Sequence, residues 1–139
     1  MAKAEPAAQI EKLCRRYLTA LESGDLKALL ANFTADATAT SPIFGRLPVR
    51  DFYAEVLRIT SSRSMALKTI FVGATDPLRA ALHVAYTRQV GEAEPATIEG
   101  VDVFELSEDR SRFSAVTIIY DTAPVRSDFA TRESNKGGI

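Results

Sequence analysis

Apolar residues recur at intervals of three and four positions near the start of the chain, which predicts an amphipathic helix from residue 7 to Ser23. The residues of this stripe are Ile10, Leu13, Cys14, Tyr17, Leu18 and Leu21. Gly24 suits the left-handed conformation that ends a helix. Asp25 suits the N-cap of a second helix, because its carboxylate can accept a backbone N–H. The buried side of that second helix is expected to carry Leu26, Leu29, Leu30 and Phe33.

The spacing changes after Asp36, where small residues alternate with threonines and predict a first strand that ends near Pro42. Residues 43–47 are expected to form a loop, and Pro48 to lie in the first turn of a third helix. This helix is expected to end near Thr60, and its apolar positions are Val49, Phe52, Tyr53, Val56 and Leu57.

The second half of the chain has the pattern of strands separated by turn-forming segments. The expected strands are residues 65–73, 79–89, 96–106 and 113–120, with a hairpin loop at residues 90–95. Three helices followed by long consecutive strands indicate an α+β fold. In such a fold the helices pack inside a curved antiparallel sheet, with a pocket between the two layers.

Composition and charge narrow the classes of function. With 139 residues, of which 46% are hydrophobic and 25% charged, the chain has an ordinary globular composition and can bury one sizeable core. We expect a single domain at residues 7–122, a disordered lead at 1–6 and a flexible tail at 123–139. A net charge of −1 offers no basic surface for nucleic acid, and no apolar run is long enough to span a membrane.

Cysteine and histidine usage adds expectations about compartment and metals. A single cysteine excludes an internal disulfide and favours a cytoplasmic protein. Cys14 is interpreted as a small core residue, because a nucleophile would need a nearby base and none is evident. One histidine and scattered carboxylates lack the spacing of metal ligands, and no glycine-rich phosphate-binding loop occurs. Neither a metal nor another cofactor is therefore expected.

Strand parity places an acidic side chain inside the predicted pocket. Asp102 shares a face with Phe104 and Leu106, which are too apolar for the side that faces water. Apolar neighbours should raise the pKa of Asp102 by desolvation. The other inward residues of the three last strands are Val84, Tyr86, Ile98, Gly100, Val116, Ile118 and Tyr120. A hairpin whose paired residue numbers sum to 186 places Val84 opposite Asp102 and Tyr86 opposite Gly100.

The outer side of the sheet is expected to be unusually apolar. Its apolar members are Ile70, Val72, Ala85, Val101, Val103 and Ile119. Because a solvated sheet face should be polar, this side predicts a homodimer packed sheet to sheet. His83 is expected on the same side, as a surface or interface residue. Arg88 lies near the end of the hairpin and is expected to be solvated.

A set of short motifs runs through most of the chain. The motifs are Ala20-Leu21, Gly24-Asp25, Leu29, Phe33, Asp36-Ala37, Pro42, Phe52-Tyr53 and residues 101–104. Together they resemble the NTF2-like superfamily, and most closely its ketosteroid-isomerase and SnoaL-like branches. The resemblance covers roughly residues 8–120 and implies the cone-shaped NTF2-like (cystatin-like) fold. It says less about function, because this fold carries enzymes, binding modules and transport factors.

The resemblance also implies a pair of hydrogen-bond donors. In ketosteroid isomerases, a Tyr on the first helix and a protonated Asp on a late strand donate to the carbonyl oxygen of the substrate. The matching residues are Tyr17 and Asp102, and a contact between them is expected to raise the pKa of Asp102 further. The family's general base corresponds to Ser41, which cannot take a proton near neutral pH. The residues expected to line the substrate pocket are Ser41, Phe33, Phe52, Tyr53, Val84, Tyr86, Val116 and Tyr120.

Three functions compete, in the following order. The first is a SnoaL-like enzyme that isomerises or cyclises a hydrophobic, carbonyl-bearing, polyketide-like or steroid-like substrate. Asp102 would act as acid/base or neutral donor, and Tyr17 as a hydrogen-bond donor. The second is a non-catalytic pocket for a hydrophobic small molecule. The third is an epoxide hydrolase of the limonene-epoxide-hydrolase type, which needs two carboxylates around an arginine.

Overall fold

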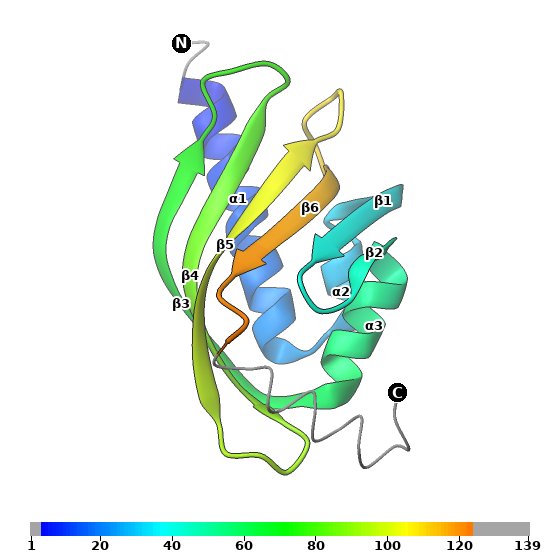
Figure 1. Cartoon of the computed structure of the whole chain (residues 1–139). Helices are drawn as coiled ribbons and strands as arrows, with labels where there is room; N and C mark the ends of the chain where they lie inside the picture. The colour runs from blue at the N-terminus through cyan, green and yellow to red at the C-terminus, as the bar shows by residue number, and fades with distance from the viewer. Residues whose placement is uncertain (1–3, 124–139) are drawn as a thin grey trace.

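Three helices and six strands make up the part of the chain that the computed structural model describes, residues 4–123 (Figure 1). The helices are α1 (Ala4–Ser23), α2 (Leu26–Leu30) and α3 (Val49–Ile59). The strands are β1 (Phe33–Ser41), β2 (Gly45–Pro48), β3 (Thr60–Val72), β4 (Arg79–Val90), β5 (Ala96–Leu106) and β6 (Phe113–Tyr120). The predicted α+β architecture is confirmed. No helix within residues 4–123 combines the length and the apolar character needed to cross a bilayer.

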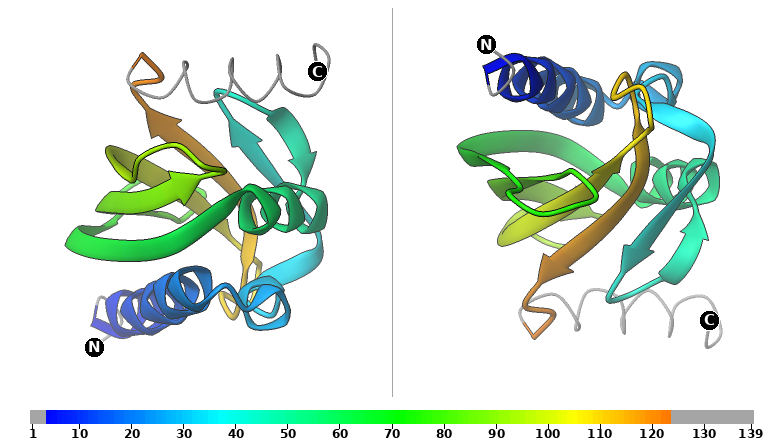
Figure 2. Two further views of the ribbon diagram at one scale, coloured as in Figure 1. Left: turned by 90° about the horizontal axis from the view of Figure 1, so that it is seen from below. Right: turned by 90° about the horizontal axis from the view of Figure 1, so that it is seen from above.

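The strands form one sheet in the order β2-β1-β6-β5-β4-β3. Neighbouring strands run antiparallel except β1 and β6, which pair in parallel. This pair departs from the wholly antiparallel sheet that the sequence suggests, because the chain passes through β2 to β5 before β6 returns beside β1. The sheet curves around α1 and α3, which lie on its concave side (Figure 2).

The corner between α1 and α2 forms as its residues predict. Gly24 has a φ of +74°, in the left-handed region that favours glycine. The Asp25 carboxylate caps α2 by accepting a hydrogen bond from the backbone N–H of Ala28 at 3.0 Å. The first helix begins at Ala4, inside the segment expected to be a disordered lead. The rest of that lead, residues 1–3, and residues 124–139 of the expected tail lie outside the described residues.

Two segments expected to be irregular belong to strands. The expected loop at 43–47 contains the start of β2, which pairs with β1 through Ser41 and Gly45. The polar run after α3 is the first part of β3, where Thr60 pairs with Val90. Both strands lie at the edges of the sheet, and most of their side chains in these segments are exposed or half-buried. An edge strand of this kind has no alternation of apolar and polar residues from which to predict it.

The register of the β4–β5 hairpin differs from the predicted one by two residues. The numbers of the paired residues sum to 184, so Leu82 lies opposite Asp102, and Val84 lies opposite Gly100. The turn is wider than expected: the last pair between β4 and β5 is Arg88 with Ala96, and Val90 continues β4 by pairing with β3 alone. A shift of two preserves parity, and Asp102 therefore faces the concave side as predicted.

The outer face of β3 also differs from the prediction. The register of β3 shifts between Leu67 and Thr69, so Ile70 pairs with the buried Leu82 and faces the concave side. Val72 has the same parity as Ile70. The large apolar side chain of β3 on the outer face is therefore Phe71.

An aromatic cluster fixes α1 against the sheet. The rings of Phe104 and Phe113 stack with their centroids 3.9 Å apart, and the Tyr17 ring stands edge-on to both. All three side chains are fully buried. Buried aromatic rings contribute much of the energy of a core and prefer such stacked and edge-to-face geometries. The cluster therefore gives the Tyr17 hydroxyl a defined position above the concave face.

Candidate functional site

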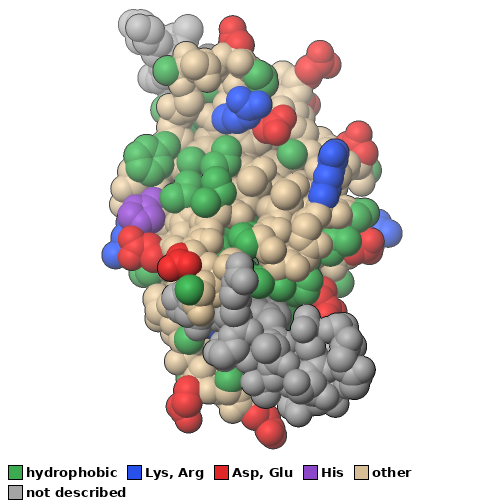
Figure 3. Space-filling model, in the orientation of Figure 1, with side chains coloured by type: hydrophobic (Ala, Val, Ile, Leu, Met, Phe, Trp, Pro, Cys, Tyr) green, Lys and Arg blue, Asp and Glu red, His purple; other side chains and the backbone are tan. Residues whose placement is uncertain are grey.

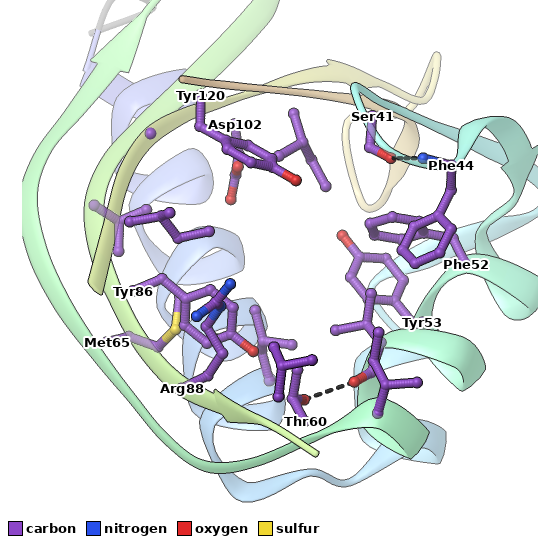
Figure 4. A pocket seen from close by; sticks show the side chains of 18 of the residues that line it. Ser41, Phe44, Phe52, Tyr53, Thr60, Met65, Tyr86, Arg88, Asp102 and Tyr120 are labelled. Carbon is purple, nitrogen blue, oxygen red and sulfur yellow. Dashed lines mark hydrogen bonds between the residues drawn. The ribbon is translucent and has the colours of Figure 1, made fainter. Parts of the chain in front are cut away.

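A mostly apolar cavity lies between α1, α3 and the concave face of the sheet (Figure 4). It leaves about 100 Å³ for the centres of water-sized molecules. The predicted site residues that line it are Tyr17, Ser41, Phe52, Tyr53, Val84, Tyr86, Asp102 and Tyr120. They come from α1, β1, α3, β4, β5 and β6, so the cavity depends on the complete fold.

Asp102 is the one acidic side chain among the described residues that line the cavity. It lies on β5 between Leu82 of β4 and Ile118 of β6, and 7% of its surface is exposed. Burial raises the pKa of Asp102 to about 7, because the charged carboxylate loses its hydration. At neutral pH the group is therefore present in both protonation states, and it can donate a hydrogen bond or accept a proton.

Tyr17 connects Asp102 to a second tyrosine. The hydroxyl oxygens of Tyr17 and Tyr53 lie 2.8 Å apart, and the Tyr17 O–H donates a long hydrogen bond of 3.5 Å to Asp102 Oδ2. Burial raises the pKa of each tyrosine well above its usual range, so both phenols remain protonated. The O–H of Tyr17 stabilises the ionised carboxylate and so lowers the pKa of Asp102, contrary to the predicted direction. The larger effect of burial still raises it.

Ser41 ends β1 and faces the cavity. Its Oγ accepts a hydrogen bond from the backbone N–H of Phe44 at 3.2 Å, across the turn that leads to β2 (Figure 4). The position to which the sequence resemblance assigns the base of ketosteroid isomerases therefore stands at the cavity wall. It holds a hydroxyl that is already used as a hydrogen-bond acceptor.

Two residues predicted to line the pocket lie away from its wall. Phe33 is buried in the aromatic cluster, with its ring centroid 6.2 Å from that of Tyr17. Val116 is buried on β6 between Ala39 and Phe104. Val116 points inward as strand parity predicts, and Phe33, expected on the second helix, begins β1; both belong to the hydrophobic core and not to the wall of this cavity.

Arg88 lines the cavity, although its place near the hairpin end suggests a solvated side chain. Only 3% of its surface is exposed. The end of α3 closes this side of the cavity, and the backbone N–H of Gly91 donates to the carbonyl oxygen of Ile59 at 3.1 Å. The signal for an inward Arg88 was present in the sequence, because it has the same parity as Val84 and Tyr86.

Cys14 and His83 lie outside the cavity wall. Cys14 is fully buried in α1, and burial raises the pKa of its thiol to about 12, so it remains a protonated core residue as predicted. His83 lies on the other side of the sheet, where its Nε2 is 2.6 Å from Glu99 Oε2. Neither group contributes to the chemistry of the cavity.

The sequence matches one family of known domains. The sequence model of the SnoaL-like domain matches residues 14–112, which is more than half of the chain. The comparison with curated proteins found no match.

Solved structures share the fold at low sequence identity. PrhC from Penicillium brasilianum NBRC 6234 superposes with a TM-score of 0.76 and 17% identity, over 96% of this chain and 93% of PrhC. For the BvnE pinacolase from Penicillium brevicompactum the TM-score is 0.75 and the identity 16%, over 94% of this chain and 98% of the pinacolase. A hypothetical protein with a ketosteroid isomerase-like fold from Catenulispora acidiphila DSM 44928 superposes with a TM-score of 0.71 and 11% identity, over 84% of this chain and 90% of that protein. At these identities the likeness shows the fold, which is the NTF2-like cone that the sequence motifs imply.

Proposed function

The chain belongs to the SnoaL-like domain family, and from this premise we propose that it isomerises or cyclises a hydrophobic, carbonyl-bearing substrate by proton transfer. The observation that carries the proposal is Asp102, a buried carboxyl group with a pKa of about 7 that faces an apolar cavity beside a tyrosine hydroxyl. A general acid or base works best when its pKa lies near the working pH. Asp102 has this property without a second charged group beside it.

In the proposed reaction, Asp102 moves a proton between two positions of the substrate. Its ionised form removes a proton from the carbon next to the carbonyl group, and negative charge develops on the carbonyl oxygen. The Tyr17 hydroxyl, which stays protonated, donates a hydrogen bond to that oxygen. Protonated Asp102 then returns the proton to a different carbon, so the enzyme ends in its starting state.

Non-catalytic binding of a hydrophobic molecule is the second candidate function. It is supported by Ser41, which stands where the related isomerases carry their base. Protonated Asp102 and Tyr17 would then serve only to recognise a ligand oxygen. The epoxide-hydrolase alternative has less support, because Asp102 is the one carboxylate that lines the cavity within the described part of the chain, although Arg88 supplies an arginine.

Exchange of α-protons in D₂O tests the proposal with 2-tetralone, an apolar bicyclic ketone. We expect the wild-type protein to speed the exchange above the buffer rate, with a rate that rises through about pH 7 as Asp102 ionises. A positioned base contributes roughly 10²–10⁴-fold, and Asp102→Asn should remove that contribution. Proton NMR of the ketone follows the reaction, and titration of the ketone shows whether the variant still binds it.

Glu108→Gln is the matched control, because it removes a carboxylate from an exposed position. It should leave the exchange rate unchanged. Binding of the ketone without exchange by the wild-type protein would favour the non-catalytic function. Exchange that persists in Asp102→Asn would contradict the role proposed for Asp102.

A further inference from the structure

Arg88 brings a positive charge to the side of the cavity opposite Asp102 (Figure 4). It is 97% buried, and its one hydrogen bond within residues 4–123 runs from Nη1 to the carbonyl oxygen of Ala96, at 3.3 Å. A guanidinium group carries five N–H donors and does not lose its proton in proteins. Most of the donors of Arg88 are therefore available to a molecule in the cavity.

The surroundings of Arg88 hold no anion to balance it within the described residues. No carboxylate between residues 4 and 123 forms an ion pair with it. Its neighbours in the cavity include Tyr86 and Tyr120, and burial raises the pKa of both phenols, so they stay neutral. A buried charge is costly unless it is paired, and Arg88 cannot relieve this cost by losing its proton.

Tyr86 provides a second unused donor beside Arg88. Its hydroxyl is buried near the hydroxyl of Thr60 and the guanidinium groups of Arg63 and Arg88, and in the described part of the chain it forms no hydrogen bond of good geometry. The two residues lie two positions apart on β4 and therefore share its concave side. A guanidinium with most of its donors unused and a hydroxyl without a well-formed hydrogen bond therefore lie together in one mostly apolar enclosure.

We propose that the Arg88 side of the cavity binds a carboxylate group of the substrate, with the Tyr86 hydroxyl as an additional donor. The planar fork of an arginine matches the two oxygens of a carboxylate. The inference rests on the proposed function only in taking the cavity as the substrate site. It narrows the substrate class to hydrophobic keto acids, with the carboxylate at Arg88 and the reacting carbonyl group at Tyr17 and Asp102.

The sheet indicates the shape of such a substrate. Asp102 of β5 lies opposite Leu82 of β4. Arg88 lies six residues beyond Leu82 on β4, which corresponds to roughly 20 Å of extended chain. The long Arg88 side chain spans part of this separation. A substrate that reaches both groups is therefore elongated, with an apolar body between its two polar ends.

Binding of 2-naphthoate and 2-naphthamide tests the proposal. The two probes match in size and shape, but only the first is charged. At pH 6 the probe carboxyl is ionised while Asp102 is mostly protonated, so Asp102 does not repel the anion. The chain contains no tryptophan, so naphthalene fluorescence can be followed without that background. We expect the wild-type protein to bind 2-naphthoate roughly 10- to 100-fold more tightly than the amide, the usual range for hydrogen bonds to a charged group.

Two variants assign the preference to its residues. Arg88→Met keeps a long side chain without the charge and should remove the preference, because it weakens the binding of 2-naphthoate far more than that of 2-naphthamide. Tyr86→Phe keeps the ring and should weaken 2-naphthoate binding by up to roughly 10-fold. The control is Arg79→Met, the same change at an exposed position of β4, which should alter neither affinity.

The outcomes separate this inference from the proposed function. Equal affinity of the wild-type protein for both probes overturns the carboxylate site, while the proton-exchange assay can still succeed. A preference that survives in Arg88→Met also overturns it. If neither probe binds, the carboxylate site is overturned, and the exchange assay with 2-tetralone decides the proposed function separately. Tight 2-naphthoate binding without exchange of 2-tetralone supports the carboxylate site in a protein that only binds its ligand.

Discussion

At the scale of single residues, the cavity holds two groups whose charged forms have lost most of their water, and they respond differently. Asp102 can take up a proton, and burial raises its pKa to about 7. Arg88 cannot become neutral at any physiological pH. The first group makes the stability of the fold depend on pH, and the second favours an anionic ligand. Both lower the stability of the empty protein, as functional sites commonly do.

The pKa of Asp102 leads to a prediction about stability. The folded protein binds the proton of the Asp102 carboxyl group more tightly than the unfolded chain does. The stabilisation of the fold by this protonation is therefore fully present below about pH 4. It is lost as the pH rises through about 7. Asp102→Asn keeps the shape of the side chain and removes its titration. The free energy of unfolding of the variant, relative to that of the wild type, should therefore increase as the pH rises. The expected change in this difference between pH 5 and pH 8 is on the order of 2–3 kcal/mol.

Urea unfolding of both proteins at several pH values measures this difference, and contributions from all other groups cancel in the comparison. Parallel stability profiles would mean that Asp102 titrates like an exposed carboxylate. An NMR titration of the Asp102 carboxyl carbon checks the same point independently.

At the scale of elements, we expect the end of β1 to influence which chemistry the cavity can perform. Ser41→Asp should introduce or raise isomerisation of a 3-keto-Δ5 steroid, because it places a carboxylate where related isomerases carry their base. The new side chain can still accept the hydrogen bond from Phe44, so the turn should persist. A general base contributes roughly 10²–10⁴-fold in rate, and the wild-type protein should show little turnover. The absorbance of the conjugated enone product measures the reaction.

Ser41→Asn is the control for this prediction, since the amide keeps the shape without the basicity and should stay inactive. A steroid that binds Ser41→Asp but does not react would show that residue 41 does not face the reacting carbon. Strong turnover by the wild-type protein would mean that the base for this steroid is not residue 41 but a group already present, for which Asp102 is the candidate.

How far the sequence predicts each element depends on where that element lies. The bounds of β5 and β6 follow from their alternation, since each has one buried face. β2 and the start of β3 lie at the edges of the sheet, and their sequences show no such alternation. In the site, parity identifies Asp102 as inward but cannot tell a cavity wall from a filled core, which is why Val116 was misplaced; the helical spacing that predicted a buried Phe33 has the same limit. Arg88 was missed because the way α3 closes over the hairpin is a long-range contact.

At the scale of the whole molecule, the outer face of the sheet carries an apolar patch (Figure 3). We define it by Phe71, Ala81, Val101, Val103 and Ile119, which strand pairing places on neighbouring positions of this face. Phe71 is 49% exposed and Ile119 is 54% exposed. Contiguous apolar surface of this kind marks interfaces more often than solvated surface. We propose that two copies of the chain pack through this patch.

Ile119→Glu tests the proposed homodimer. A carboxylate in the centre of an apolar interface is costly to bury, so the variant should be monomeric at micromolar concentrations where the wild-type protein is a dimer. Light scattering coupled to size-exclusion chromatography gives both masses. Ala8→Glu, on the exposed side of α1, should leave the mass of the dimer unchanged. A monomeric wild-type protein would refute the proposal.

A ribosome completes β1 and β2 long before β6, yet β6 is the strand that joins them to the rest of the sheet. Until residue 120 has emerged, no strand pairing joins the β1–β2 pair to the β3–β5 strands, and each group has an open edge. Contacts between such distant segments also form late, because a long loop must close first. The cavity takes its walls from both groups of strands, so we expect a newly made chain to bind ligand only after β6 has joined them. Truncation before β6 would remove that property entirely.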